Sequence, residues 1–533
     1  MTEYIRSTAA GQQPIPFHFD FSPLGNRLEL SNTLRRSVPH TASESFSSRW
    51  GMMLAMISLA VGTGNVWRFP RIAATNDGGT FLVPWLIFLF AWSIPLLMIE
   101  FTMGKAMRAG PVDAFGKLIG SRFRWMGLWV AFTATAIMFY YSVVTGWTLR
   151  FFIAVLTGEI PDAVPGSFWQ GFEGSGQAVL THAVMMSAGV ALVYHGVRGI
   201  ERIARLLLPT LLLLIIALMV RALSLPNAHI GLDFLFTVHW EQLANAELWM
   251  QALTQNAWDT GAGWGLILTY AIYARSREDT TLNAALIGFG NNSISLMAGI
   301  LVLCTIFSVR PDAATEIVGA GNNGLTFIWV PQLFAGMPGG RLFMALFFLA
   351  LLFAAFTSLV SMIELATRVL VDRRVNRRRA VLFVGLAGLL FGLPSALSPS
   401  FFNNQDAVWG IGLMVSGLLF TVAVLRYGAR RFRLIFMNTS ESDFTVGGWW
   451  RTMVVFLLLE AVVLLAWWLS QTISAEGLAA SLNPFAEWSL GTVLLQWGTV
   501  LTLFILWNRR AERGKLVPIG NRRKTRDAEE DPR

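Results

Sequence analysis

About twelve apolar segments recur along the chain, each close to the roughly twenty residues that an α-helix needs to cross a bilayer. Of the 533 residues in the chain, 54% are hydrophobic and 14% are charged. This composition excludes an ordinary soluble protein. The segments predict an all-α polytopic membrane protein in a lipid bilayer. The net charge of +9 does not make nucleic acid an expected partner, because the basic residues lie in short runs between the segments. The expected spans are residues 50–75, 80–104, 124–156, 177–194, 202–223, 248–274, 281–309, 341–371, 380–396, 405–426, 450–474 and 487–508.

The basic runs also predict the topology. They follow the second, fourth, sixth and eighth segments, and the densest lies between residues 373 and 379. The loop between the third and fourth segments instead carries Glu159, Asp162 and Glu173, with no Lys or Arg. Because cytoplasmic loops carry an excess of Lys and Arg, both termini are expected in the cytoplasm. The chain itself is expected in the plasma (inner) membrane.

The first segment is interrupted at the depth where it should be most apolar. Residues 60–70 contain two glycines, an asparagine, an arginine and a proline. A helix in lipid must satisfy all of its backbone groups internally, and polar side chains at that depth are costly. A simple glycine kink needs neither Asn65 nor Arg68. The pattern therefore favours a broken helix, whose free carbonyls and helix ends can bind a cation and a charged group of a small ligand.

The sixth segment has the same feature. Residues 255–265 place Asp259 among three glycines, again at bilayer depth. Segments one and six occupy corresponding places if segments one to five repeat as segments six to ten. Paired broken helices at corresponding places are typical of secondary transporters with inverted repeats, and we expect that architecture.

The opening of the chain resembles a known family. Residues 49–51, 60–70, 76–84 and 94–105 are similar to the first two spans of the neurotransmitter:sodium symporters, and the resemblance extends to about residue 425. It implies the leucine-transporter fold, a five-plus-five inverted repeat with discontinuous helices 1 and 6 and about 12 transmembrane helices. It also implies a symporter that couples sodium to the uptake of an amino acid or a related amine by alternating access. The apolar and aromatic lining of the implied substrate site favours a neutral, hydrophobic α-amino acid. The implied division is a cytoplasmic tail (1–48), a ten-helix transport core (49–425), two additional helices (426–508) and a cytoplasmic tail (509–533).

The resemblance assigns a second sodium site made only of oxygen ligands, which suit a hard cation. Its implied ligands are Ser58, Val61, Ala354, Thr357 and Ser358. An alternative for the two hydroxyl residues is a hydrogen bond to the preceding turn of their own helix.

The implied first sodium site departs from the family pattern. Its residues are Ala60, Asn65, Asp259 and Asn291, and the family has a hydroxyl residue where this chain has Asp259. The neighbouring anion-site region comprises Trp85, Gln255, Asp259 and Ser295. Because a carboxylate is a built-in anion, we expect two sodium sites and no requirement for chloride. Asp259 could instead carry a coupled proton, pair with a cationic substrate side chain, or serve the structure alone.

The resemblance also assigns a substrate site. Its residues are Ala60, Gly62, Gly64, Ile137, Tyr141, Trp258, Gly261, Trp264, Ser358, Leu359 and Met362. Family members that carry amino acids have glycine at the position of Gly62, which lets the carboxylate of the substrate approach sodium. Tyr141 is expected to donate its hydroxyl to that carboxylate. Whether the two tryptophans narrow the pocket is left open by the sequence.

Gates are implied at both ends of the pathway. Arg68 is expected to pair with Asp406 on the outer side, and Tyr273 and Asp372 match the inner gate. Residues 311–340 resemble the loop that caps the outer vestibule.

The inner gate lacks its usual arginine, whose place falls near Ser43. Either Arg35, Arg36 or Arg49 replaces it, or the gate is weaker in this chain, and Phe46 stands where the family has tryptophan. Glu100 is expected to brace the broken sixth span.

An enzyme is not expected, because the chain has no nucleotide-binding loop, no metal-ligand spacing of histidines and no serine with a matching base. Proton coupling, a channel and a receptor that binds an amino acid without moving it remain alternatives. The particular amino acid, the ion stoichiometry and a homodimer are also left open.

Overall fold

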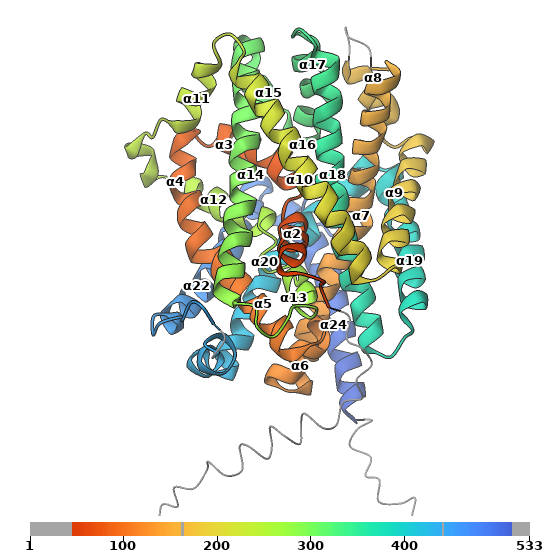
Figure 1. Ribbon diagram of the computed structural model, residues 1–533, viewed down its shortest axis with the longest axis vertical. Helices are drawn as coiled ribbons and strands as arrows, with labels where there is room; N and C mark the ends of the chain where they lie inside the picture. The colour runs from red at the N-terminus through yellow and green to blue at the C-terminus, as the bar shows by residue number, and fades with distance from the viewer. Residues whose placement is uncertain (1–44, 161–164, 440–441, 514–533) are drawn as a thin grey trace, which may run out of the picture. The chain divides into compact units, whose positions relative to one another are not determined.

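The computed structural model describes residues 45–160, 165–439 and 442–513, and this part of the chain contains helices and no strand (Figure 1). Most of the expected tail 1–48 and of the C-terminal tail lies outside the described residues. The helices are α2 (Arg49–Ala60), α3 (Phe69–Thr75), α4 (Gly79–Phe88), α5 (Ile94–Met107), α6 (Pro111–Ile119), α7 (Arg124–Thr157), α8 (Pro165–Phe172), α9 (Gly176–Tyr194), α10 (Val197–Leu223), α11 (Ala228–Phe236), α12 (Ala246–Asp259), α13 (Leu266–Ala271), α14 (Thr280–Val309), α15 (Ala314–Gly319), α16 (Gly321–Asn323), α17 (Val330–Ala335), α18 (Gly340–Asp372), α19 (Arg377–Leu397), α20 (Pro399–Tyr427), α21 (Ala429–Phe432), α22 (Trp450–Glu476), α23 (Leu478–Ser481) and α24 (Leu490–Arg513).

Among the described residues, ten helical stretches are long and apolar enough to cross a membrane. The pair Arg49–Ala60 and Gly64–Thr75, bent by 52° at its break, makes an eleventh span. Helices α12 and α13 together occupy the place of the expected sixth span, interrupted between residues 260 and 265. The prediction of about 12 transmembrane helices agrees with this arrangement.

The first span breaks where glycines allow the backbone to leave the helix and a polar side chain takes over a backbone hydrogen bond. Helix α2 ends at Ala60, and Val61 adopts an extended conformation with φ −76° and ψ 103°. The backbone N–H of Gly62 is then bound by the Asn65 side-chain oxygen at 2.8 Å. A π-helical turn, Gly64–Arg68, leads into α3.

The sixth span breaks at left-handed backbone positions. Gly261, Gly263 and Gly265 have φ values of +71°, +89° and +78°, a region that side chains with a Cβ rarely adopt. Glu100 of α5 accepts hydrogen bonds from the N–H groups of Gly263 at 2.6 Å and Leu268 at 3.2 Å. This confirms the expectation that Glu100 braces the break.

The helices form two groups around α2 (Figure 1). In one group, α7 packs along α18, and both contact α9 and α19. In the other, α12 packs on α4, α13 on α5, and α14 on α2, α3 and α5. The first group corresponds to spans three, four, eight and nine and the second to spans one, two, six and seven, as a five-plus-five repeat requires.

The loop of residues 311–340 is anchored by aromatic rings. Phe327 stacks on Trp169 with ring centroids 4.6 Å apart and planes within 2°, and it also contacts Phe151. Asn322 accepts a hydrogen bond from Nε of Arg71 at 2.7 Å. The loop is therefore joined to the outer half of the first span.

Candidate functional site

A cavity of about 370 Å³ lies between the breaks of the first and sixth spans. It also reaches Asn322 and Asn323 of the loop 311–340 and Trp467 and Trp468 of α22, so it extends toward the end of the helices that this loop covers. Of the expected substrate residues, the cavity is lined by Ala60, Gly62, Gly64, Ile137, Tyr141, Trp258, Gly261, Trp264, Ser358 and Met362.

Leu359 is the expected substrate residue that does not line the cavity. Its side chain is fully buried and faces Gly189 of α9. The reason is helical geometry, since Leu359 lies about 100° around α18 from Ser358 and so faces a neighbouring helix.

Gly62 leaves room for a ligand beside two hydroxyl groups. A Cβ at this position would lie 3.0 Å from both Ser358 Oγ and Tyr141 Oη. The Tyr141 hydroxyl is also 3.2 Å from the N–H and from Oγ1 of Thr63. A small anionic group that approaches the first break can therefore meet hydroxyl donors and backbone N–H groups together.

The two tryptophans of the sixth span form one wall of the cavity. The Trp258 and Trp264 rings meet edge to face with centroids 6.4 Å apart. Trp258 also lies against Gly410 of α20, where a Cβ would fall 2.0 Å from the ring. Gly261 lies next to Ala60, with a hypothetical Cβ 3.7 Å from the Ala60 Cβ. The wall is therefore aromatic on one side and narrow where the two breaks meet.

The residues expected at the second sodium site come together between α2 and α18. Thr357 Oγ1 lies 2.8 Å from the Ser58 carbonyl and 3.1 Å from the Ala354 carbonyl. Ser358 Oγ lies 3.4 Å from the Val61 carbonyl. Thr357 is also 3.1 Å from Phe353 O on its own helix, so back-bonding and contact with α2 occur together. Ser358 Oγ also lies 3.3 Å from the Leu59 carbonyl, so hydroxyl and carbonyl oxygens, the kind of donor that suits Na⁺, form two adjoining groups here.

The residues expected at the first sodium site meet around Asn291 of α14. One amide atom of Asn291 lies 3.1 Å from the Ala60 carbonyl and 2.9 Å from the Asp259 carbonyl. With its oxygen there, Asn291 accepts from Asn65 Nδ2 at 2.8 Å, and three oxygens converge as a cation requires. With its nitrogen there, it donates to both carbonyls, and its oxygen lies 3.3 Å from Asn65 Nδ2. The amide can therefore serve either a cation or a closed hydrogen-bond set.

The two carboxylate oxygens of Asp259 have different surroundings. Oδ2 accepts hydrogen bonds from Gln255 Nε2 at 3.1 Å and from Ser295 Oγ at 3.2 Å. Oδ1 is buried, and among the described residues it has no hydrogen-bond partner. Asn65 Nδ2 donates to Ser295 Oγ at 2.8 Å, so the surroundings of Asp259 are continuous with the first sodium site.

Trp85, the fourth residue of the expected anion-site region, lies beside this group. Its carbonyl accepts from Asn256 Nδ2 at 3.0 Å, and its ring packs on Phe69 with centroids 4.6 Å apart. The indole Nε1 is buried and has no hydrogen-bond partner within the described chain. Trp85 therefore supports the broken helices mainly by packing.

At the outer end, Arg68 and Asp406 both line the cavity. The Arg68 guanidinium lies over Trp258, 4.8 Å from the ring centroid. No ion pair between Arg68 and Asp406 occurs within the described part of the chain. The expected outer pair therefore stays a prediction for a state in which this end is closed.

At the inner end, the two expected gate residues have separate partners. Tyr273 Oη donates to Glu364 Oε1 at 2.7 Å, and Arg377 binds Glu364 Oε2 at 2.6 Å. Asp372 pairs with Arg368 at 2.8 Å and accepts from the Gly110 N–H at 2.6 Å. Of these contacts, the Tyr273–Glu364 hydrogen bond joins the sixth span to α18, and the Gly110–Asp372 hydrogen bond joins the turn before α6 to α18.

The expectation for the missing gate arginine needs a correction. Arg49 pairs with Glu278 at 3.5 Å, so it does not take that place beside Asp372. Arg368 occupies it instead, one turn before Asp372, and its guanidinium lies over the Tyr273 ring. The other two candidates, Arg35 and Arg36, lie outside the described residues, as does Ser43.

Sequence reasoning did not single out Glu364 and Arg377. The signal was present, because a glutamate within an apolar span is costly unless it has a partner. The partner could not be read from the sequence, since Arg377 follows a helix end and reaches back to α18.

Broken helices at corresponding places and a cavity between the two breaks are the architecture of a secondary transporter. A profile of the Sodium:neurotransmitter symporter family matches residues 43–171 and 166–507. The chain belongs to this family. It is therefore a sodium-coupled symporter of the membrane, not an enzyme.

Similar proteins agree with this assignment. An uncharacterized sodium-dependent transporter of Methanocaldococcus jannaschii is 30% identical over 452 residues, which cover 79% of this chain and 90% of the relative. The sodium- and chloride-dependent GABA transporter ine of Drosophila melanogaster is 28% identical over 71% of this chain and 45% of its own length. The crystal structure of MhsT in complex with L-phenylalanine superposes with a TM-score of 0.71 at 28% identity, covering 80% of this chain and 99% of MhsT. The fold is therefore the leucine-transporter fold.

Proposed function

We propose that the protein imports a neutral, hydrophobic α-amino acid with Na⁺ and without a requirement for Cl⁻. The apolar and aromatic lining favours a hydrophobic side chain, and Gly62 beside Tyr141 and Ser358 favours a free carboxylate. The L-phenylalanine that is in complex with MhsT belongs to the same class of ligand.

The surroundings of Asp259 carry the proposal of chloride independence. Gln255 and Ser295 are the donors expected at the anion site, and both donate to Asp259 Oδ2. That oxygen supplies the negative charge that the anion would bring. Oδ1 has no hydrogen-bond donor in the described chain, which leaves it available to the first sodium ion. One carboxylate then serves both purposes.

Transport follows from the two helix groups. In our proposal, Na⁺ and the amino acid bind at the paired breaks from the outer side. The group of α2 to α5 and α12 to α14 then rocks against α7, α9, α18 and α19. The inner end opens, and both ligands leave into the cytoplasm, the side on which the basic loops predict the termini.

Substitution of Asp259 tests this proposal. Asp259→Ser removes the built-in anion and leaves a hydroxyl group, so uptake should become dependent on chloride. The measurement is sodium-driven uptake in proteoliposomes with chloride or gluconate. Asp406→Ser is the matched control, because it also removes a carboxylate that lines the cavity but lies away from Gln255 and Ser295.

Each result has a distinct meaning. Chloride dependence in Asp259→Ser alone supports the proposal. Full activity without chloride in this variant contradicts it. Wild-type uptake that ignores Na⁺ but follows a pH gradient favours the second candidate, a proton-coupled transporter. That candidate is supported by the same observation, since a buried carboxylate oxygen without a partner is a natural proton acceptor.

A further inference from the structure

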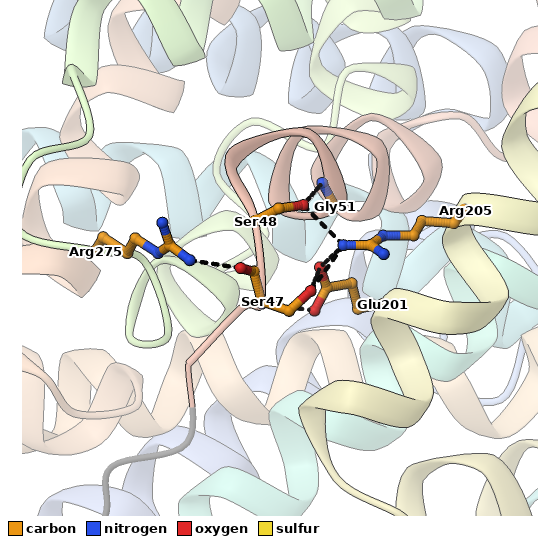
Figure 2. Close-up of polar contacts among 6 residues, drawn as sticks. All are labelled: Ser47, Ser48, Gly51, Glu201, Arg205 and Arg275. Atoms are coloured by element: carbon orange, nitrogen blue, oxygen red, sulfur yellow. Dashed lines mark hydrogen bonds and ion pairs between the residues drawn. The ribbon is translucent and has the colours of Figure 1, made fainter.

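The short segment Phe46–Ser48, which precedes α2, is held from two sides (Figure 2). Glu201 and Arg205 of α10 lie on one side of it, and Arg275, which follows α13, lies on the other. These elements are far apart in the sequence. Their convergence on two serines is not explained by the substrate or sodium sites.

The α10 side forms a charged cluster around Ser47. Glu201 accepts from the Ser47 N–H at 2.8 Å and from the Ser47 hydroxyl at 2.7 Å. Arg205 Nη2 lies 2.6 Å from Glu201 Oε1 and 2.7 Å from the hydroxyl oxygens of Ser47 and Ser48. Glu201 is 3% exposed, so its charge is kept in place by these partners.

The other side binds the backbone of the same segment. Arg275 donates to the Ser47 carbonyl, and the Phe46 N–H donates to the Tyr273 carbonyl at 3.3 Å. The Phe46 ring is buried against Tyr270 and Tyr273, with centroids 6.1 and 6.4 Å away. The Phe46 ring therefore covers the inner half of the sixth span, and we call this ring the plug.

Helix α2 is built to lie directly on this cluster. Ser48 caps the helix by accepting from the Gly51 N–H at 3.0 Å. A Cβ at Gly51 would fall 1.8 Å from Glu201 Oε1 and 2.8 Å from Arg205 Nη2. The first turn of α2 thus contacts the charged pair closely, and any outward swing of α2 breaks these contacts first.

We propose that Glu201 and Arg205 are positioning residues for transport, which latch the start of α2 through Ser47 and Ser48 and so keep the inner pathway closed. This latch is separate from the Arg368–Asp372 pair, which occupies the place of the missing gate arginine. The inference rests on the proposed function, because a latch matters only if α2 moves during transport. Its opening exposes the surface beneath Phe46.

A cysteine placed beneath the plug reports this opening. Ser361 is 1% exposed, and its hydroxyl lies 2.8 Å from Tyr270 Oη. The sequence has one cysteine, Cys304, so Ser361→Cys in a Cys304→Ser background gives a single reactive thiol. The experiment measures its rate of alkylation by a maleimide in purified protein in K⁺ buffer, without sodium or amino acid.

Two variants should open the latch by different routes. Glu201→Gln removes the charge that binds Arg205 and should raise the alkylation rate about tenfold, the scale of one hydrogen bond to a charged group. Gly51→Ala should raise it in the same direction, because the new methyl group displaces the carboxylate although alanine favours the helix.

The matched control is Asp113→Asn. Asp113 is also a carboxylate bound by two arginines, Arg124 at 3.1 Å and Arg373 at 3.5 Å. It lies on α6, and its partners do not include α2. This variant should be alkylated at the parent rate.

The native cysteine, Cys304, distinguishes opening of the latch from a general loosening of the fold. Cys304 is fully buried in α14, so its alkylation in variants that retain it, without Ser361→Cys, reports loss of the fold. Faster alkylation at position 361 with Cys304 unchanged supports the latch. Parent rates in both variants overturn it, as does an equal rise at both cysteines. If the wild type does not bind an amino acid in a sodium-dependent way, the proposed function is contradicted instead. The two outcomes are separable, because the alkylation assay contains no sodium.

Discussion

The two ends of the pathway differ in how their charges are paired. At the outer end, Arg68 and Asp406 face the same cavity without an ion pair between them in the described chain. At the inner end, Glu364 and Asp372 are each bound by an arginine. The cavity extends toward the loop 311–340, whereas hydrogen bonds of Tyr273 and Gly110 to α18 join separate elements at the end near the start of α2.

The largest effect is expected from breaking the buried pair of the inner end. Glu364→Ala leaves Arg377 beside α18 without its carboxylate, and loss of one partner of a buried pair costs about 3 kcal/mol or more. Thermal unfolding of the purified protein should therefore occur at a clearly lower temperature. Glu512→Ala is the control, because that glutamate accepts a hydrogen bond from a neutral group, the Ser121 hydroxyl. Equal stability of both variants would remove Glu364 from the account of the inner end.

A smaller effect is expected from preventing closure of the outer end. Arg68→Gln removes the cation that is expected to meet Asp406, so a bound amino acid should dissociate about tenfold faster, the scale of one charged hydrogen bond. Dissociation of radiolabelled ligand after dilution measures this rate. Arg71→Gln also changes an arginine of the cavity and loses the contact with Asn322, so it should have a lesser effect. A reversed order would assign the outer gate to Arg71.

The smallest effect is expected at Arg49. The Arg49 guanidinium is half-exposed and lies 3.5 Å from Glu278, whose side chain is buried, so the pair should contribute about 1 kcal/mol, less than the Glu364–Arg377 pair. Arg49→Gln should leave the thermal midpoint and the alkylation of Ser361→Cys nearly unchanged. A large rise in alkylation would restore Arg49 as a gate residue and weaken the role given to Glu201 and Arg205.

Much of the fold could be predicted because insertion into a membrane restricts where apolar, charged and glycine residues can occur in the sequence. The spans follow from apolar length, and both breaks follow from glycines and charges at bilayer depth. The residues assigned to the second sodium site also lie near the first break, where Thr357 contacts the Ser58 carbonyl and Ser358 lies near the Val61 carbonyl.

The inner contacts could not be predicted in the same way. Ser47 and Glu201 are separated by 154 positions, and neither lies in a motif whose spacing indicates a partner. The sequence also did not show which neighbour a helical residue faces. Leu359 follows Ser358 in the sequence and still faces α9. Packing between distant helices decides both features.

The most direct test is the binding of a set of radiolabelled neutral amino acids to the purified wild-type protein. Retention is compared in Na⁺ and K⁺ buffers, each with chloride or gluconate. We predict that one or a few hydrophobic amino acids are retained in Na⁺ only, to the same extent with either anion. Retention that needs chloride would contradict the role of Asp259, and retention that ignores sodium but changes with pH would contradict sodium coupling at the paired breaks.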